Sequence, residues 1–303
     1  MSLDIRPADA KEAAVVARII NLAFAAAGHR RERSAAGLAR MISREPGGIL
    51  LAFKDGDPAG VAVARTFGSL GILAEWAVLP THKGRGIGDE LFTHALDYLA
   101  RKSAQTVGLV TWADGPLMAY LRRSFRPAHA ALAFRRRLDV EPRPLQAWDD
   151  RPDGERLTAL AHVRRLGDRL LAGLDHAKDA VAGRGDGSTR LYLDWAEPGQ
   201  ALRGYALLEI APWHEGEDAR LARVLALVHL EPEGPSFDAF FDGIERDLAA
   251  RGVRQMRLSA YAATGAGIGT LLRRGYSCKE ALLRMYLRGG EVTSAVCWEL
   301  WSV

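Results

Sequence analysis

Cysteine is almost absent from this chain of 303 residues, which contains only Cys278 and Cys297. Two cysteines cannot build a disulfide framework, and no group of histidine, cysteine and carboxylate residues has the spacing of metal ligands, so we expect no metal site. The sequence also lacks an N-terminal signal peptide and any apolar run of about 18 residues. These absences predict a soluble, cytoplasmic protein that does not bind membranes.

Lysine is scarce as well, so most of the 41 Lys and Arg residues are arginines. Together with the abundant alanine, this composition suggests a GC-rich bacterial genome and carries no functional meaning. The net charge of +4 arises from basic residues interspersed with 37 acidic ones, which predicts no nucleic-acid partner but is compatible with a polyanionic cofactor. The length and a hydrophobic content of 48% suit one large or two ordinary globular domains.

The most informative stretch covers residues 75–99. An apolar segment ends at Pro80, glycine then occupies every second position from 84 to 88, and apolar residues recur at helical spacing from Ile87 onward. This pattern predicts a strand, a glycine loop and a helix. The first N–H groups of a helix lack intrahelical partners and lie at the positive end of its dipole, so the loop is a predicted anion site. Glycine would let a phosphate approach the backbone closely.

Two familiar glycine loops fit this stretch poorly. A nucleotide P-loop ends in Gly-Lys-Ser/Thr, whereas here Gly88 is followed by Asp89. A dinucleotide fingerprint, Gly-x-Gly-x-x-Gly, would need glycine where Asp89 stands. A further interpretation is a tight strand-to-helix turn that needs glycines and binds no ligand.

The pattern resembles instead the coenzyme A loop of the GNAT superfamily of N-acetyltransferases, Gln/Arg-x-x-Gly-x-Gly/Ala after a strand that ends in Val-x-Pro. This sequence has Lys83-x-x-Gly86-x-Gly88 after Val78-Leu79-Pro80, so lysine replaces the usual first residue. The resemblance implies that acetyl-CoA binds here, with its thioester carbonyl bonded by backbone N–H at the end of the strand. The residues implied in coenzyme binding are Ala77, Val78, Lys83, Gly84, Arg85, Gly86, Ile87, Gly88, Asp89, Asp114 and Tyr120.

A second GNAT feature begins at Tyr120. The family usually has Tyr-x-x-x-Gly-Phe here, and this chain matches it at Tyr120 and Phe125 but has Ser124 in place of glycine. In the family this tyrosine protonates the departing thiolate, so the resemblance implies that Tyr120 is the general acid. The alternative is a packed tyrosine whose hydroxyl is merely hydrogen-bonded. The asparagine that is common seven residues before the tyrosine is Ala113 here, and Asp114 could partly replace it.

Glu75 is the candidate general base. Carboxylates at this place act as bases in some relatives, often through water, whereas the alternative is a buried structural carboxylate bonded to a helix of the first half. His82 lies beside the phosphate loop and is interpreted as a loop residue. The basic run from His29 to Arg33 is either a solvated loop or a patch that faces the acceptor, since the first helix–helix loop of GNAT folds borders the acceptor cleft.

The expected order of elements in the first half also matches the GNAT order. Strands are expected at 3–7, 49–54, 59–66, 70–78, 106–112 and 130–138, and helices at 10–26, 34–41, 87–99 and 117–123. The predicted fold class is therefore α/β (α+β). Its sheet is expected to be mixed, mostly antiparallel and twisted, with flanking helices and a splay between the fourth and fifth strands.

The second half of the chain repeats the first. Residues 224–229 echo 73–78, and residues 241–250 echo 91–100, which predicts two tandem copies of one domain. Residues after Leu138 are rich in proline and charge, which is typical of a linker. The expected organisation is an N-terminal GNAT domain at 1–140, a linker at 141–155, a C-terminal GNAT-like domain at 156–288 and a tail at 289–303.

The second copy lacks the residues on which the predicted chemistry depends. Its loop, residues 231–237, contains two glutamates and two prolines, and Leu271 stands in the place of Tyr120. Proline removes N–H donors and glutamate repels phosphate. We therefore expect the C-terminal copy to be degenerate, without coenzyme binding.

These observations predict an acyl-CoA-dependent N-acyltransferase that transfers acetyl from acetyl-CoA to a primary amine by direct attack. The active site is expected in the N-terminal domain, the acceptor is expected to be a small-molecule or peptide amine, and the protein a monomer or homodimer. The alternative is a non-catalytic acyl-CoA-binding or sensor module, which Ser124 and Ala113 favour slightly because they depart from the family pattern.

Overall fold

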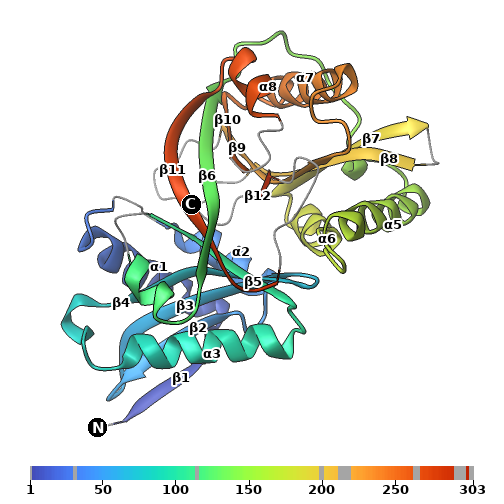
Figure 1. Cartoon of the computed structure of the whole chain (residues 1–303). Helices are drawn as coiled ribbons and strands as arrows, with labels where there is room; N and C mark the ends of the chain where they lie inside the picture. Colours follow the sequence, from blue (N-terminus) through green and yellow to red (C-terminus); the bar gives the residue numbers. More distant parts are fainter. Residues whose placement is uncertain are drawn as a thin grey trace. The chain divides into compact units, whose positions relative to one another are not determined.

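A computed structural model of the chain describes residues 2–29, 33–112, 116–197, 201–210, 220–261, 267–289 and 298–299 (Figure 1). These residues form two compact units, the first ending at Leu109 and the second beginning at Val110. In each unit helices cover a mixed sheet, as the predicted α/β fold class requires. No helix among the described residues combines the length and the apolar character needed to cross a membrane.

The strands of the first unit are β1 (Leu3–Pro7), β2 (Ile49–Lys54), β3 (Asp57–Phe67), β4 (Leu70–Val78) and most of β5 (Thr106–Thr111), whose last two residues belong to the second unit. They lie side by side in chain order, antiparallel from β1 to β4, and β5 pairs parallel with β4. The hairpin between β2 and β3 turns at Asp55 and Gly56, whose φ angles are 52° and 93°. Positive φ at both positions is the reason why Asp-Gly is favoured in two-residue hairpin turns.

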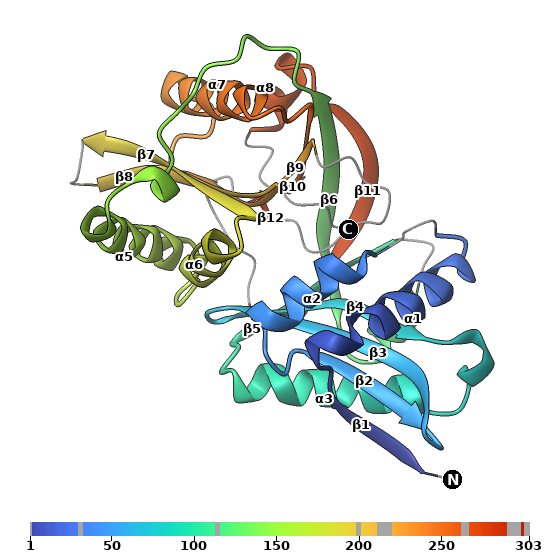
Figure 2. The ribbon, with the colours of Figure 1, turned by 180° about the vertical axis from the view of Figure 1, so that it is seen from behind.

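The helices of the first unit are α1 (Ala13–Ala25), α2 (Ala35–Arg44) and α3 (Ile87–Arg101), and single 3-10 turns are η1 (Ala10–Glu12) and η2 (Pro80–His82). The helices α1 and α2 bury apolar side chains such as Ile20 and Met41 against one face of the sheet. On the opposite face α3 packs against β4 (Figures 1 and 2). The rings of Phe92 and Trp76 lie 5.0 Å apart between these elements.

The strands β4 and β5 separate before either ends. Their parallel pairing joins Leu70–Leu73 to Thr106–Leu109, whereas β4 continues to Val78. The end of the pairing lies where the sequence predicts the splay between the fourth and fifth strands. Beyond it, β4 leads into η2 and the glycine loop before α3.

The second unit contains the strands β6 (Arg126–Arg137), β7 (Thr189–Glu197), β8 (Ala201–Glu209), β9 (Leu221–His229), β10 (Gln255–Tyr261), β11 (Ser277–Arg288) and β12 (Trp298–Glu299). Their order is β11-β6-β10-β9-β8-β7, and β12 pairs with β9. Its helices are α4 (Leu117–Leu121), α5 (Asp153–Leu170), α6 (Ala177–Gly185), α7 (Pro235–Ala250) and α8 (Ile268–Arg273), with the 3-10 turn η3 (Trp148–Asp150).

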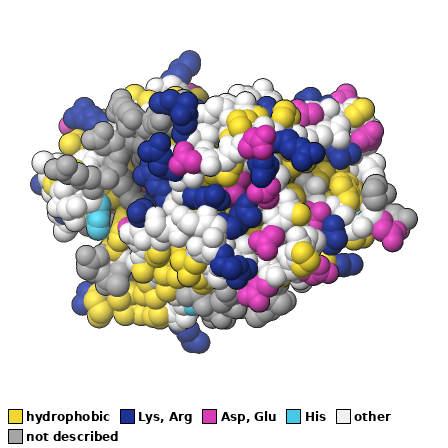
Figure 3. Space-filling view, turned by 90° about the horizontal axis from the view of Figure 1, so that it is seen from above, with side chains coloured by type: hydrophobic (Ala, Val, Ile, Leu, Met, Phe, Trp, Pro, Cys, Tyr) yellow, Lys and Arg dark blue, Asp and Glu magenta, His cyan; other side chains and the backbone are white. Residues whose placement is uncertain are grey.

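On the face seen in Figure 3, basic side chains lie among acidic ones.

The predicted repeat is visible in the connections of the two sheets. In the first unit, α3 joins β4 to the parallel strand β5, and in the second, α7 joins β9 to the parallel strand β10. The second pairing is also short, because it joins only Leu221–Arg223 to Gln255–Arg257, although β9 continues to His229.

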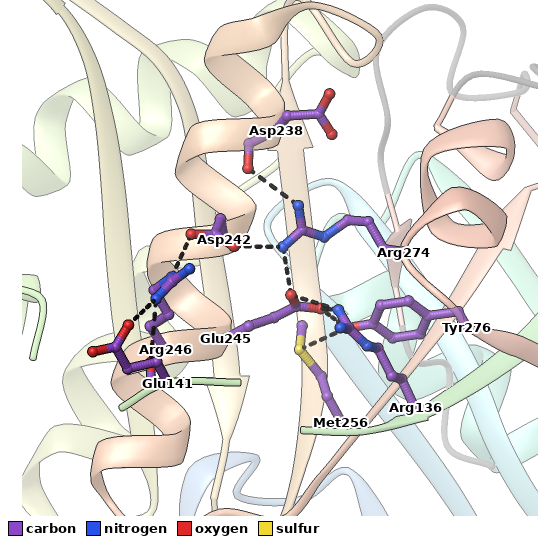
Figure 4. A network of polar contacts seen from close by, with 9 residues as sticks. All are labelled: Arg136, Glu141, Asp238, Asp242, Glu245, Arg246, Met256, Arg274 and Tyr276. Carbon is purple, nitrogen blue, oxygen red and sulfur yellow. Dashed lines mark hydrogen bonds and ion pairs between the residues drawn. The ribbon is translucent and has the colours of Figure 1, made fainter. Parts of the chain in front are cut away.

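The strand β6 comes from the first half of the sequence but pairs with strands of the second half. It pairs antiparallel with β10 on one side and with β11 on the other. Its Arg136 donates to both oxygens of Glu245 on α7 at 2.7 Å, and this buried carboxylate also accepts from Arg274 at 2.5 Å and from the Tyr276 hydroxyl at 2.8 Å (Figure 4). Three donor groups compensate the cost of burying the charge of Glu245.

The compact units therefore divide the chain at a different place from the predicted domain limits. Sequence similarity assigns β6 to the N-terminal domain, 1–140, but its strand partners belong to the C-terminal half. The segment 141–155 is also attached to the second unit, because Trp148 is buried and the Leu145 N–H donates to Asp247 at 2.9 Å. The limits 1–140, 141–155, 156–288 and 289–303 stay predictions about homology.

Candidate functional site

The loop before α3 is shaped by two glycines in the left-handed region. Gly84 and Gly86 have φ angles of 74° and 78°, a conformation that costs other residues energy, and Gly86 is the N-cap of the helix. A Cβ placed on either glycine would have no atom of the described chain within 4 Å. The backbone on this side of the loop is therefore open to a ligand.

The amides of this loop are the main feature of the site. The N–H groups of residues 84–88 donate to no acceptor in the described part of the chain, whereas those of Asp89 and Glu90 donate to the Gly86 carbonyl at 3.0 and 3.2 Å. Consecutive unsatisfied N–H groups next to left-handed residues form a concave anion site, and the helix dipole adds positive potential. The loop can thus bind a phosphate through its backbone.

Charged side chains at the loop act in opposite directions. Lys83 and Arg85 are exposed, and neither forms an ion pair with another described residue. Asp89 and Glu90 in the first turn of α3 are exposed as well; they stabilise the helix N-terminus and lower the positive potential there. Backbone donors and two exposed cations therefore have to outweigh two carboxylates when an anion binds.

Trp76 fixes the loop to the preceding strand, a contact that the sequence did not predict. Its Nε1–H donates to the carbonyl of Gly88 at 2.8 Å, and a Cβ on Gly88 would lie 3.3 Å from the Trp76 ring. Ile87 is buried beneath the loop. A side chain at position 88 would thus crowd Trp76, whereas Gly84 and Gly86 are favoured by their left-handed backbone conformation. The only sequence signal for this contact is the alternation along β4.

The predicted thioester-binding residues Ala77 and Val78 lie at the end of β4. On one edge they pair with Val61 and Gly60 of β3, while on the other edge the pairing with β5 has already ended at Leu73. Ala77 is buried and Val78 is half-buried. This strand end, the loop 83–88 and the start of α3 follow one another directly, so the structure brings these predicted residues together.

Glu75 is buried and forms an ion pair with Arg33, which lies just before α2. The bond joins Arg33 Nε to Glu75 Oε1, whereas Glu75 Oε2 is buried and accepts no hydrogen bond from a described residue. The structure therefore contains the buried, bonded carboxylate that was considered as the alternative to a base. The partner, Arg33, lies just before the N-cap of α2, and the second carboxylate oxygen is inaccessible to solvent in this structure.

Tyr120 belongs to the second unit and lies on the short helix α4. It is half-buried, its ring is 6.0 Å from that of the buried Phe125, and burial raises the pKa of its hydroxyl above the ordinary value of about 10. Tyr120 thus keeps its proton at neutral pH, as a general acid must. Asp114, the remaining predicted coenzyme contact, lies outside the described residues.

The structure explains why glycine is usual where this chain has Ser124. Ser124 has a φ of 66°, in the left-handed region, and the corresponding residue of the second copy, Gly275, has a φ of 80°. In both copies the following residue is a buried aromatic, Phe125 or Tyr276. Ser124 therefore keeps the backbone path of the motif at the cost of strain.

Comparisons with known proteins agree with the resemblance of the glycine loop and the Tyr120 motif to GNAT proteins. Residues 16–125 match the model of the acetyltransferase (GNAT) family. No curated protein matches the chain in sequence. The structure of a candidate acetyltransferase from Pyrococcus horikoshii is 16% identical and has a TM-score of 0.69, with 99% of this chain and 95% of that chain covered.

Two further solved structures are similar over nearly the whole chain. A GCN5-related N-acetyltransferase from Sphaerobacter thermophilus is 18% identical with a TM-score of 0.63, covering 99% of this chain and 98% of that chain. A tandem GNAT protein from the clavulanic acid biosynthesis pathway is 15% identical with a TM-score of 0.59, covering 96% of this chain and 100% of that chain.

The two kinds of comparison support different statements. At these identities the solved structures establish the fold, including the tandem arrangement, whereas the family model covers both the glycine loop and the Tyr120 motif. The predicted fold class is thus confirmed, and the predicted family is matched by residues 16–125. The chain carries an acetyltransferase (GNAT) family domain within residues 16–125 and has the fold of tandem GNAT proteins.

Proposed function

We propose that this chain is an acetyl-CoA-dependent N-acetyltransferase with one active site, formed by residues of the first half. The observation that carries the proposal is the row of N–H groups at residues 84–88, which have no acceptor among the described residues and lie at the N-terminus of α3. Coenzyme A carries a pyrophosphate, and such a row of donors suits its oxygens. Lys83 and Arg85 add exposed positive charge at the same place.

Each of the predicted residues has a distinct task in this proposal. The backbone at Ala77 and Val78 holds the thioester carbonyl, whose oxygen becomes negatively charged when the acyl carbon turns tetrahedral. The donor supplies an acetyl group activated as a thioester. Asp89 and Ile87 form the first turn of the helix beneath the phosphates, and Asp114 is a further proposed contact.

The proposed reaction is a direct transfer. The amine nitrogen of the acceptor attacks the acyl carbon, a C–N bond forms, and the C–S bond breaks. Tyr120 donates its proton to the departing sulfur, and the proton lost by the amine goes to Glu75 or to water. Alignment and proton transfer are sufficient for this chemistry, because the thioester is already activated.

The acceptor is proposed to be a primary amine of a small molecule or a peptide. No nucleic-acid partner is part of this proposal, because 37 acidic residues are interspersed with the 41 basic ones in the sequence. The protein is proposed to act as a monomer or homodimer in the cytoplasm.

A second candidate function is a non-catalytic acyl-CoA-binding module. Ser124, which occupies a left-handed position where the family has glycine, is the specific observation in its favour, since it departs from the motif that presents Tyr120. Both candidates bind acetyl-CoA, but only the first releases free thiol in the presence of an amine.

The experiment that tests the proposal combines binding and turnover. Calorimetry with acetyl-CoA should show a saturable site, and a panel of primary amines (amino acids, polyamines, aminoglycosides and peptide N-termini) should reveal amine-dependent thiol release. Binding without thiol release with any amine would favour the non-catalytic module. Absence of binding would contradict both candidates.

A further inference from the structure

The first unit contains a buried ion pair between the candidate base, Glu75, and Arg33, a residue to which the proposed reaction gives no role. The side chains of Arg33 and Glu75 are each only 2% exposed, although they lie 42 positions apart in the sequence. Burying two charges is costly, and an apolar pair of similar size would often stabilise a fold at least as well. Stability of the fold alone therefore does not explain why this pair is present.

The carboxylate is bonded asymmetrically. Arg33 Nε donates to Oε1, while Oε2 has no donor among the described residues although it too is buried. A buried carboxylate oxygen without a hydrogen bond is unfavourable, so a water or a ligand N–H is expected to bond it. The structure thus presents a single defined acceptor position on Glu75.

Arg33 is itself held by the first helix. The Arg33 N–H donates to Asn21 Oδ1 at 2.6 Å, and Asn21 Nδ2 donates to the Arg33 carbonyl at 3.1 Å. Both backbone groups of Arg33 are therefore bonded by one side chain of α1. Directly after it, the hydroxyl of Ser34 caps α2 by accepting from the Gly37 N–H at 3.0 Å.

These contacts form a chain of three residues that ends at the candidate base. We propose that Asn21 and Arg33 are positioning residues, which fix Glu75 so that Oε2 faces the N–H of the acceptor amine or of the water that relays its proton. This inference rests on the proposed function. In the step concerned, an N–H bond of the ammonium breaks, the proton moves to Oε2, and the nitrogen lone pair becomes free to attack the acyl carbon.

Arg33 has two effects in this arrangement. By holding Oε1 it restricts the rotation of the carboxylate, which leaves one oxygen for the substrate. Its positive charge also compensates the charge of the buried carboxylate. A group that only stabilised the fold would need the ion pair but not the free oxygen.

The test is a double-mutant cycle on kcat, with the amine that gives the fastest thiol release. We expect Glu75→Gln to lower kcat roughly 100-fold, within the usual range for a general base, and Arg33→Lys to lower it about 10-fold because lysine keeps the charge without the Nε–H geometry. Asn21→Ala should lower kcat several-fold. In the Glu75→Gln background, neither Asn21→Ala nor Arg33→Lys should lower kcat further, since both act through Glu75.

Asn21→Ala keeps the test informative if changes at the buried pair prevent folding, because Asn21 is only half-buried. Tyr98→Phe is the matched control: it removes a different buried hydrogen bond to a carboxylate of the same unit, that of Tyr98 to Glu45 at 2.5 Å. Tyr98→Phe should lower the melting temperature without a change in kcat. All variants should keep the acetyl-CoA affinity of the native chain within about twofold.

The outcomes separate this inference from the proposed function. Wild-type kcat in Asn21→Ala and Arg33→Lys, or losses that add to that of Glu75→Gln, would overturn the positioning roles while leaving the acetyltransferase intact. Acetyl-CoA binding without turnover of any amine would overturn the proposed function and this inference together. Coupled losses in kcat with unchanged coenzyme affinity would support it.

Discussion

The two strand–loop–helix segments of the repeated fold differ in what they offer an anion. In the first, between β4 and α3, the N–H groups of residues 84–88 have no acceptor in the described chain. In the second, between β9 and α7, the N–H of Gly234 donates to the Glu231 carbonyl at 3.2 Å, and that of Glu231 donates to His229 Nδ1 at 3.0 Å. Two further positions of the second loop are prolines and have no N–H group.

The side chains around the two loops also differ. His229 is fully buried and its other ring nitrogen lies 3.0 Å from Asp194, so the end of β9 carries a fixed imidazole where β4 has Val78. Glu231 accepts from the Ser236 hydroxyl at 3.1 Å, and a carboxylate thus stands where the first loop has cations. Leu271, at the place of Tyr120, is buried and has no hydroxyl.

Both α3 and α7 have the same dipole direction relative to their strands, so a helix N-terminus alone does not distinguish the two loops. What differs is the number of N–H groups left without an acceptor and the sign of the nearest side chains. Comparing copies within one chain therefore separates the fold, which is shared, from the predicted chemistry, which belongs to the first copy.

The largest expected effect comes from placing a negative charge in the first loop. Gly86→Asp should weaken acetyl-CoA binding about 100-fold, roughly 2.7 kcal/mol, because a carboxylate would stand among the phosphate donors. Gly86→Asn is the matched control of nearly equal size, and about 10-fold weaker binding is expected from bulk alone. Aspartate and asparagine both tolerate the left-handed φ of 78°, so both variants should fold.

Calorimetry of the two variants, with circular dichroism to confirm folding, measures this effect. Equal affinities for Gly86→Asp and Gly86→Asn would mean that no phosphate lies near residue 86. Native affinity in both variants would remove the loop from the coenzyme site altogether.

The next effect concerns turnover, which we expect only from the first copy, because the second has Leu271 at the position of Tyr120. Tyr120→Phe keeps the ring contact with Phe125 and removes only the hydroxyl, so kcat should fall roughly 10- to 100-fold while acetyl-CoA affinity stays unchanged. Because burial raises the pKa of Tyr120, the wild-type kcat should not decline through its ionisation below about pH 10. Thiol release measured across pH tests both statements, and wild-type kcat in Tyr120→Phe would contradict the general-acid role.

A smaller effect is expected on thermal stability when the same backbone position is changed in the two copies. Ser124→Gly should stabilise the chain by about 1 kcal/mol because it relieves the strain at a φ of 66°. The reciprocal change, Gly275→Ser at a φ of 80°, should destabilise by a similar amount. Thermal unfolding should show shifts of roughly 2–4 °C in opposite directions. Shifts of the same sign would mean that side-chain contacts, and not backbone strain, decide these positions.

The smallest effects come from neutralising single exposed charges. Lys83→Gln should weaken acetyl-CoA binding only a few-fold, since the loop amides supply most of the affinity and solvent screens an exposed cation. Glu233→Gln in the second loop should leave the affinity unchanged. Calorimetry of the pair measures the contrast, and tighter binding in Glu233→Gln would indicate that the second loop also approaches the coenzyme.

The sequence predicted the first loop well because its signals are local. The strand was predicted at 70–78 and is observed there, and the helix begins at Ile87 as its apolar spacing indicates. Alternating glycines, a proline and helical periodicity depend on neighbours within a few residues. The same local pattern predicts the anion site, which stays a prediction.

Contacts between distant residues were not predictable in this way. Nothing near Arg33 or Glu75 in sequence indicates that they form a buried pair, and the bonds of Asn21 to Arg33 depend on how α1 packs. The strand β6 was expected as the last strand of the first domain, but its partners β10 and β11 lie far along the chain. Pairing of a strand with either half satisfies the same alternation of residues, so sequence alone does not choose between them.

The stoichiometry of acetyl-CoA binding tests the central claim most directly, because it asks whether the two copies differ as their loops do. Titration of the full chain in a calorimeter should give one coenzyme per chain, and Gly86→Asp should weaken this single binding event about 100-fold. Two sites of similar affinity, or a site that survives Gly86→Asp unchanged, would show that the second copy also binds the coenzyme and would contradict the account.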